Sequence, residues 1–262
     1  MDMRDLTLPY CTPEGFELPF RDPYGVPHGT NYVPFNRASD MNIATRATFA
    51  GVKVARTHEA CSLNEARAIA SFNFNPYVVD IREQYPVYSQ DAYNRARVSG
   101  KRMARSRVMT YDVVLTFAFD QSRLHYHGVS IKDASKTELS DRDKKRMERE
   151  ETAFAKRGWT WQMMLGDNFS KRAFGNHMLM RSWIGRINIY SSRAYAKAFA
   201  TRLSGHSLEG SLNEIVARNA RYMGISRDYA FTLFGIAVSL GYLYVDHREE
   251  LRVDRPLTLL FR

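Results

Sequence analysis

The chain has 262 residues, of which 44% are hydrophobic, so it is long enough and apolar enough for one large or two ordinary globular domains. Its net charge of +10 favours a polyanionic partner, nucleic acid before membrane. The alternative is a basic protein without such a partner. The two cysteines, Cys11 and Cys61, exclude a disulfide framework and indicate a reducing compartment.

The first ten residues lack the apolar core of a signal peptide. The most apolar stretch, Tyr229 to Val245, carries no charge but is at the short limit for a membrane-spanning helix. A buried helix that runs into a strand explains it better. We therefore expect a cytoplasmic protein with no membrane partner.

Residues 9–36 are rich in proline, glycine and aromatic residues and show no apolar periodicity. This composition predicts an extended arm with turns, and the sequence leaves open whether the arm is ordered without a partner. We assign residues 1–40 to this N-terminal arm.

Residues 41–168 carry the pattern of an α/β domain, in which apolar runs of strand length alternate with helical segments. The expected order is helix, three strands, helix and strand, at residues 62–74, 77–87, 111–119, 124–132, 140–158 and 159–165, with a basic loop at 94–107. A mixed sheet flanked by helices fits this order.

Beyond a boundary within residues 165–176 the composition becomes helical. Four helices are predicted, followed by a hairpin, at residues 176–187, 192–205, 211–224, 226–241 and 242–261. Helix, short turn, helix and hairpin is the order of a winged helix-turn-helix, so we expect a winged-helix domain at residues 169–262.

Three residues of the first half suit phosphodiester hydrolysis: Glu65, Asp112 and Lys132. Mg²⁺ takes hard oxygen ligands, and one or two carboxylates plus a substrate phosphate commonly suffice. A lysine beside them can stabilise the charge that develops on the phosphate. If residues 124–132 alternate regularly, Ser130 and Lys132 project together and Gly128 leaves room beside them.

The remaining polar residues of this strand, His125 and His127, then lie on the other face, and a His-x-His pair without a third ligand is weak evidence for zinc. Each residue of the expected site also has a structural explanation. Glu65 follows Ser62 by three residues, as in a capping box; Asp112 could end a loop; and Lys132 could extend to solvent. Their joint order on the expected elements favours a site.

Asp112 followed by Ser130-Ile131-Lys132 resembles the PD-(D/E)xK nuclease pattern, although Ser130 stands where that family usually has Glu, Asp or Gln. The ordered set Ser62-x-x-Glu65, Asp80-Ile-Arg-Glu-Gln-Tyr-Pro86 and Thr110-Tyr-Asp112 resembles TnsA, the endonuclease subunit of Tn7-like heteromeric transposases. The resemblance covers about residues 40–165 and implies a restriction-endonuclease-like fold followed by a winged helix.

The resemblance also implies roles. Glu65 and Asp112 would bind Mg²⁺ as two ions, for which Mn²⁺ is expected to substitute, and the Ile131 carbonyl would be a further ligand. Lys132 would be the catalytic lysine, with Ser130 and Gln84 as supporting residues; Gln84 and its neighbour Glu83 are expected to act structurally, by holding strand and helix in register.

The family cuts the 5′ strand ends of the transposon, while an integrase-type, TnsB-like transposase subunit handles the 3′ ends. A TnsC-like AAA+ regulator contacts the C-terminal region. The chain would then be a prokaryotic, DNA-associated cytoplasmic protein.

Residues of the basic loop are expected to contact DNA phosphates near the metals, although a solvated charged loop is the alternative. These are Arg95, Arg97, Lys101, Arg102, Arg105 and Arg107. The C-terminal half offers few residues that read bases, because Arg227 is the only such residue at 226–240, so we expect backbone contacts or protein docking there.

Two other functions remain open. One is a free-standing nuclease of restriction or repair type, which would cut without partners. The other is a non-catalytic DNA-binding regulator whose nuclease fold has decayed, an alternative that Ser130 keeps open.

Overall fold

The computed structural model describes residues 2–40, 45–105, 108–133 and 140–261. Its main sheet has the strand order β3-β4-β5-β6, with β3 at Val78–Val87, β4 at Met109–Ala118, β5 at Leu124–Lys132 and β6 at Thr160–Leu165. Neighbouring strands are antiparallel except for β5 and β6, which are parallel. The predicted mixed sheet is confirmed.

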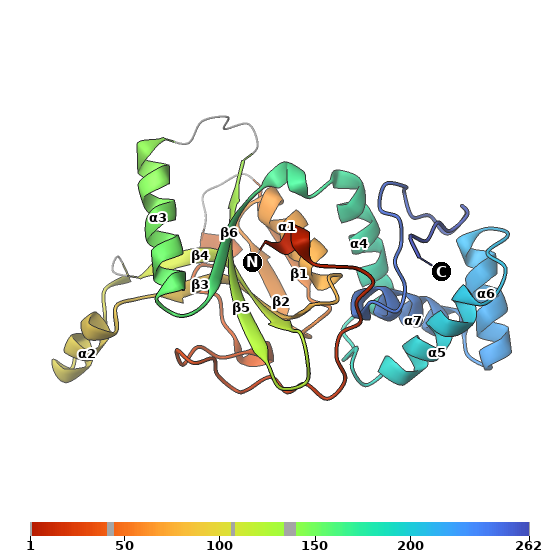
Figure 1. Cartoon of the computed structure of the whole chain (residues 1–262), viewed down its shortest axis with the longest axis horizontal. Coiled ribbons are helices and arrows are strands. Elements are labelled where there is room, and N and C mark those ends of the chain that lie inside the picture. Colours follow the sequence, from red (N-terminus) through yellow and green to blue (C-terminus); the bar gives the residue numbers. More distant parts are fainter. Residues whose placement is uncertain (1, 41–44, 106–107, 134–139, 262) are drawn as a thin grey trace.

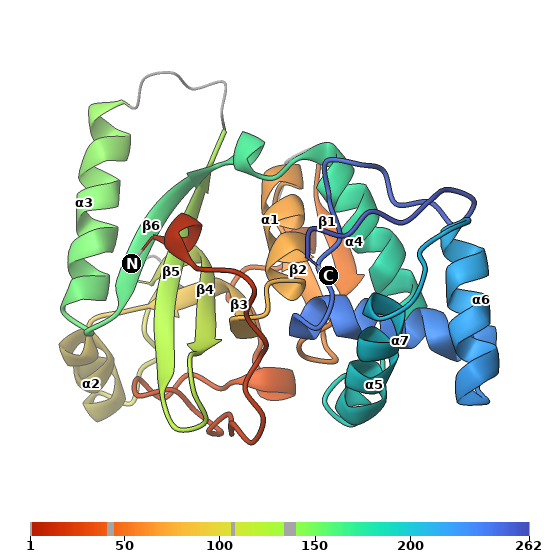
Figure 2. The same cartoon turned by 45° about the vertical axis from the view of Figure 1, so that its right-hand side comes forward.

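Helices cover both faces of this sheet. Helix α1 (Leu63–Asn73) packs on one face and α3 (Asp141–Ala155) on the other, as Figure 2 shows. The α1 face buries aliphatic residues such as Ile69 and Leu115, and the α3 face buries an aromatic group that includes Phe154 and Trp159. Helix α3 is also the crossover that two parallel strands require, because it connects β5 to β6.

A second, two-stranded sheet lies beside α1 and was not predicted. Its strands are β1 (Ala47–Ala50) and β2 (Thr57–Ala60), which pair antiparallel. Both are four residues long and alanine-containing, so their sequence carries little strand signal.

The segment predicted as a basic loop begins with a helix, α2 (Gln90–Val98), and this part of the prediction is wrong. Ser89 caps the helix by accepting a hydrogen bond from the Ala92 amide at 3.4 Å. Asp91 lies in the first turn and basic residues lie in the last turn, which is the favourable arrangement for the helix dipole. Caps and charges, not apolar periodicity, form this helix.

The N-terminal arm contains short 3₁₀ turns, η1 (Met3–Asp5), η2 (Gly29–Asn31) and η3 (Ala38–Asp40), and runs along the body of the molecule (Figure 1). The Tyr32 hydroxyl donates to the Glu83 carbonyl at 2.7 Å, and the Phe35 amide donates to the Gln84 carbonyl at 3.2 Å. The arm thereby covers β3, the edge strand of the main sheet. These contacts order the arm against the chain's own sheet.

After the short turn η5 (Gly166–Asn168) come the helices α4 (Lys171–Ile184), α5 (Arg193–Ser204), α6 (Leu212–Met223) and α7 (Arg227–Leu240). Helix α7 is largely buried and packs against the other three. The predicted capping box of α6 is present, with Ser211 and Glu214 as its members.

The predicted C-terminal hairpin forms one isolated bridge, Val245↔Leu259, and no strand there, so the winged-helix assignment stays a prediction. None of the helices in the described ranges is long and apolar enough to cross a membrane.

Candidate active site

Glu65 lies in the first turn of α1, where it makes the helix-capping contacts that the sequence suggested. Ser62 caps the helix by accepting from the Glu65 amide at 3.2 Å, and Glu65 Oε2 accepts from the Cys61 amide at 3.1 Å. Burial raises the pKa of the Glu65 carboxyl to about 7, and the negative charge of Asp112 adds to this shift. The cap therefore fixes a buried carboxylate that interacts electrostatically with Asp112.

Asp112 lies near the start of β4, beside the end of β5. Its Oδ2 accepts a hydrogen bond from the Ile131 amide at 2.7 Å. Burial raises the pKa of Asp112, while this hydrogen bond and the positive charge of Lys132 oppose the rise. Asp112 is thus electrostatically coupled to both other residues of the predicted site, Glu65 on α1 and Lys132 at the end of β5.

The donor set fits a divalent cation. Among the residues that the structure describes, no three His, Cys, Asp or Glu side chains form a ready-made metal cluster. A carboxylate pair is nevertheless the usual protein share of an Mg²⁺ site, in which water and substrate phosphate supply the other oxygens. Because the charge of Asp112 helps to raise the pKa of Glu65, a cation bound by both carboxylates would relieve their repulsion.

The two histidines of β5 lie outside this pair. His125 Nε2 and His127 Nδ1 both bond to the Thr160 hydroxyl of β6, at 2.8 and 2.7 Å. Burial lowers the pKa of His127 to about 3, so it is a neutral core residue.

Ser130 and Gly128 correct one detail of the sequence interpretation. The space beside them is filled by α3, because an added Cβ at Gly128 would collide with the Phe154 ring, and the Ser130 hydroxyl donates to Glu150. Glu150 is fully buried and also pairs with Arg146 at 2.8 Å, and its charge contributes to the raised pKa of Asp112. Charged residues flank Glu150 in the sequence, so sequence reasoning did not single it out.

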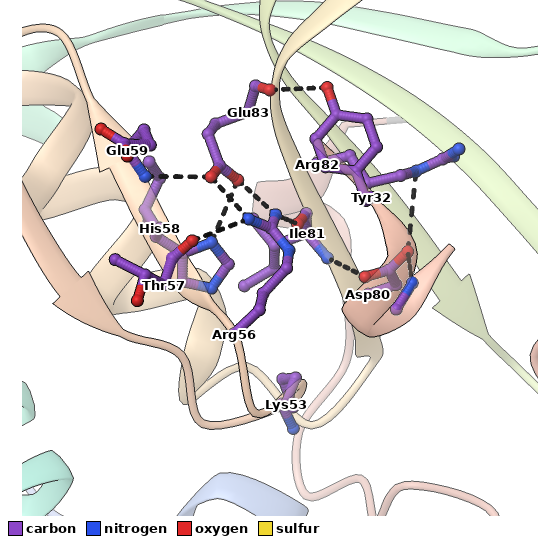
Figure 3. Close-up of polar contacts among 12 residues, drawn as sticks. Tyr32, Lys53, Arg56, Thr57, His58, Glu59, Asp80, Ile81, Arg82 and Glu83 are labelled. Atoms are coloured by element: carbon purple, nitrogen blue, oxygen red, sulfur yellow. Dashed lines mark hydrogen bonds and ion pairs between the residues drawn. The ribbon is translucent and has the colours of Figure 1, made fainter. Parts of the chain in front are cut away.

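Glu83 and Gln84 lie side by side in β3 but make different contacts. Figure 3 shows Glu83 between Arg56 and His58, at 2.5 and 3.0 Å, in a buried ion-pair network that holds β2 against β3. Although burial alone would raise the pKa of Glu83, His58 and Arg56 hold it well below its usual range. Gln84 instead reaches the site, since its Nε2 donates to Glu65 Oε2 at 3.3 Å.

The predicted DNA-binding residues gather at the end of the sheet where β4 begins. Arg95 and Arg97 are exposed on α2, which projects from the body of the molecule (Figure 1). Lys101, Arg102 and Arg105 follow it and are also exposed. Arg107 lies outside the described residues.

A mixed sheet flanked by helices, with Asp112 and Lys132 on its central strands and Glu65 on the helix beside them, has the architecture of a restriction-endonuclease-like nuclease. Residues 75–166 match the family model described as TnsA-like endonuclease, N terminal, and this segment is a TnsA-like endonuclease domain. The match contains Asp112 and Lys132 and begins after Glu65. A comparison with curated proteins gave no match.

Proposed function

We propose that the chain is a metal-dependent DNA endonuclease subunit of a Tn7-like heteromeric transposase, which hydrolyses phosphodiester bonds at the 5′ strand ends of the transposon. The observation that carries the proposal is the coupling of Glu65, Asp112 and Lys132 in and beside a TnsA-like endonuclease domain.

Each residue has a defined task in this proposal. Glu65 and Asp112 hold Mg²⁺ or Mn²⁺ with the Ile131 carbonyl, and Lys132 stabilises the charge that develops on the scissile phosphate. Ions held by these residues would supply an activated water and would neutralise charge on the leaving oxygen. The Ile131 amide fixes the rotation of the Asp112 carboxylate, so that this ligand is oriented before metal arrives.

The proposed partners are DNA, an integrase-type TnsB-like transposase subunit, and a TnsC-like AAA+ regulator that docks on the C-terminal half. The basic residues on and after α2 would contact DNA phosphates. Helix α7, which follows the turn after α6, is largely buried, so it is poorly placed to read bases. That burial supports protein docking over sequence reading for the C-terminal half, and sequence specificity would come from a partner.

The test is cleavage of DNA that carries the transposon ends, with the partner subunits present, by Asp112→Ala. Asp120→Ala is the matched control, because Asp120 is an exposed aspartate in the β4–β5 turn. We expect Asp112→Ala to abolish 5′-strand cleavage while DNA retention and folding stay unchanged. Equal cleavage by the two variants would contradict the site assignment.

One observation favours a second candidate, a non-catalytic DNA-binding regulator. The central position of the expected motif is Ser130, whose hydroxyl is occupied by Glu150. A regulator of this kind would retain DNA and cut nothing at any Mn²⁺ concentration, with all partners present.

A further inference from the structure

Gln84 has a backbone conformation that side chains rarely adopt. Its φ is +49°, and it is the one residue other than glycine with a positive φ in the part of the chain that the structure describes. Such a conformation persists only where surrounding contacts hold it, and outliers of this kind cluster at functional sites. The contacts that it permits therefore need an explanation.

The left-handed residue changes which side chains of β3 share a face. In a regular strand, residues three apart point to opposite faces. Arg82 and Tyr85 nevertheless both bond to Asp22 Oδ2, each at 2.6 Å, within the group packed on the α3 side. Gln84 instead turns toward α1, where its amide nitrogen meets Glu65. The break in alternation brings this amide to the carboxylate.

Asn36 of the N-terminal arm sets which end of the Gln84 amide faces Glu65. Asn36 Nδ2 donates to Gln84 Oε1 at 3.1 Å, so the Gln84 oxygen faces the arm and its NH₂ group faces the site. Asn36 Oδ1 in turn accepts from Arg105 Nη2 at 3.3 Å, and the same nitrogen donates to the Phe35 carbonyl at 3.0 Å. An unbroken hydrogen-bond chain thus runs from the basic segment to Glu65.

These contacts also fix the Glu65 carboxylate. Its Oε2 accepts from the Cys61 amide and from Gln84, and its Oε1 accepts from the Ser62 hydroxyl. A carboxylate offers about four lone-pair positions, two on each oxygen. Both positions of Oε2 and one position of Oε1 accept these hydrogen bonds, so the position that remains is on Oε1. One defined position is left for a cation.

We propose that Asn36 and Gln84 are positioning residues for Glu65, and that the arm and the basic segment belong to the nuclease site through the hydrogen-bond chain Arg105–Asn36–Gln84–Glu65, here called the amide chain. This inference rests on the proposed function. It assigns the arm a task in metal binding, because the arm determines the direction of the amide that orients a metal ligand.

Three variants test the amide chain. Gln84→Gly removes the amide but adopts the left-handed backbone without strain, so the strand keeps its shape. Asn36→Asp still accepts from Arg105 but has no NH₂ to donate. It therefore accepts from the Gln84 NH₂, and the Gln84 oxygen turns toward the Glu65 carboxylate. Asn36→Ala removes the contact without reversing the amide.

The matched control is Gln162→Glu. Gln162 is also an amide that joins the arm to the sheet, through the Met3 amide at 2.9 Å and Asp2 at 2.8 Å, but it has no link to Glu65. Asp112→Ala is the reference for the metal site itself.

The experiment is a calorimetric Mn²⁺ titration of the full-length variants, with thermal melting of the metal-free proteins as the check on folding. We expect about tenfold weaker Mn²⁺ affinity for Gln84→Gly and Asn36→Asp, a smaller loss for Asn36→Ala, and a change within about twofold for Gln162→Glu.

If Gln84→Gly and Asn36→Asp bind Mn²⁺ as tightly as the wild-type protein while Asp112→Ala loses binding, the positioning role of the amide chain is wrong. The proposed function would not be affected by that result. A larger loss for Asn36→Ala than for Asn36→Asp would overturn the role of amide direction. Retained Mn²⁺ binding in Asp112→Ala would instead refute the proposed metal site.

Discussion

Gly128 in β5 shows how closely α3 is packed on the sheet behind the site. A side chain at this position would occupy the space of the Phe154 ring. Phe154 is fully buried against Tyr111 and Trp159, so it has little freedom to move aside. The glycine is required here by close approach of a helix, not by its backbone conformation.

We therefore expect Gly128→Ala to lower the free energy of unfolding by roughly 1–3 kcal/mol, the usual cost of overpacking a core. Gly175→Ala is the control, because Gly175 lies inside α4 with open space around it. That change should stabilise the protein by up to about 1 kcal/mol through helix propensity. Denaturant unfolding measures both, and equal effects of the same sign would contradict this account.

Glu83 is the centre of the buried ion-pair network in Figure 3, with Arg56 and His58 almost fully buried beside it. Glu83→Gln would leave the Arg56 charge buried without compensation. Breaking a buried pair in this way typically costs about 3–5 kcal/mol. Glu14→Gln removes the exposed Lys197 pair instead and should have no measurable effect. Chemical denaturation of the two variants should separate them clearly; a Glu83→Gln protein as stable as Glu14→Gln would contradict a structural role for this network.

The residues of the candidate site were predictable to different degrees. Glu65, Asp112 and Lys132 could be selected because their chemistry and chain order suit phosphate hydrolysis, and the structure couples them electrostatically. Glu150 could not be selected, because its neighbours in sequence are charged and its burial depends on packing against β5. The orientation of Gln84 depends on one backbone angle that no residue pattern reveals.

At the scale of elements, strands with strong apolar runs were predictable and elements built on local polar contacts were not. The predicted strand at 124–132 coincides with β5, since Tyr126, Val129 and Ile131 are aromatic or β-branched residues that favour strands. Helix α2 was missed because it has no apolar face, and its formation depends on Ser89 and end charges. The strands β1 and β2 were too short to be distinguished from loop.

Helix α2 carries the prediction that belongs to this scale. Replacing both Arg95 and Arg97 by alanine should weaken DNA binding at every sequence and reduce the slope of log K against log salt by about 2, because each phosphate contact releases about one counterion. Arg123→Ala is the control, since Arg123 is exposed in the turn between β4 and β5, at the end of this hairpin that lies away from α2. Fluorescence anisotropy at several salt concentrations measures the slopes, and identical slopes for all variants would exclude α2 from the DNA interface.

At the scale of the whole molecule, the C-terminal helices and the nuclease half are joined through a buried polar contact region. Lys53, before β2, donates to the Ser239 carbonyl of α7 at 2.5 Å. His177 of α4 stacks on Phe74 after α1, with ring centroids 5.0 Å apart, and meets His247 edge-on at 4.5 Å. Burial lowers the pKa of His177, and burial lowers the pKa of His247 to about 4. Both rings are neutral in the folded protein.

This junction predicts the acid response of the fold. Below pH 6.5 the unfolded chain binds protons at these histidines, while the folded chain does not. The free energy of unfolding therefore falls as the pH falls, by up to about 1.4 kcal/mol per pH unit for each histidine. The fall ends where the pH reaches the pKa of that histidine in the folded protein. We expect His247→Gln to flatten the dependence between pH 6.5 and about 4. Unfolding free energies measured across this range provide the test; a variant with the wild-type pH slope would place the response elsewhere.

The proposed function requires that Glu65 and Asp112 form a metal site. Its most direct test is a calorimetric Mn²⁺ titration of the wild-type protein beside Asp112→Ala, because metal binding can be read without the partner subunits that cleavage would require. We expect Mn²⁺ binding by the wild-type protein and its loss in Asp112→Ala, with both proteins folded. Equal binding in the two proteins, or no binding by the wild-type protein in the presence of DNA, would contradict it.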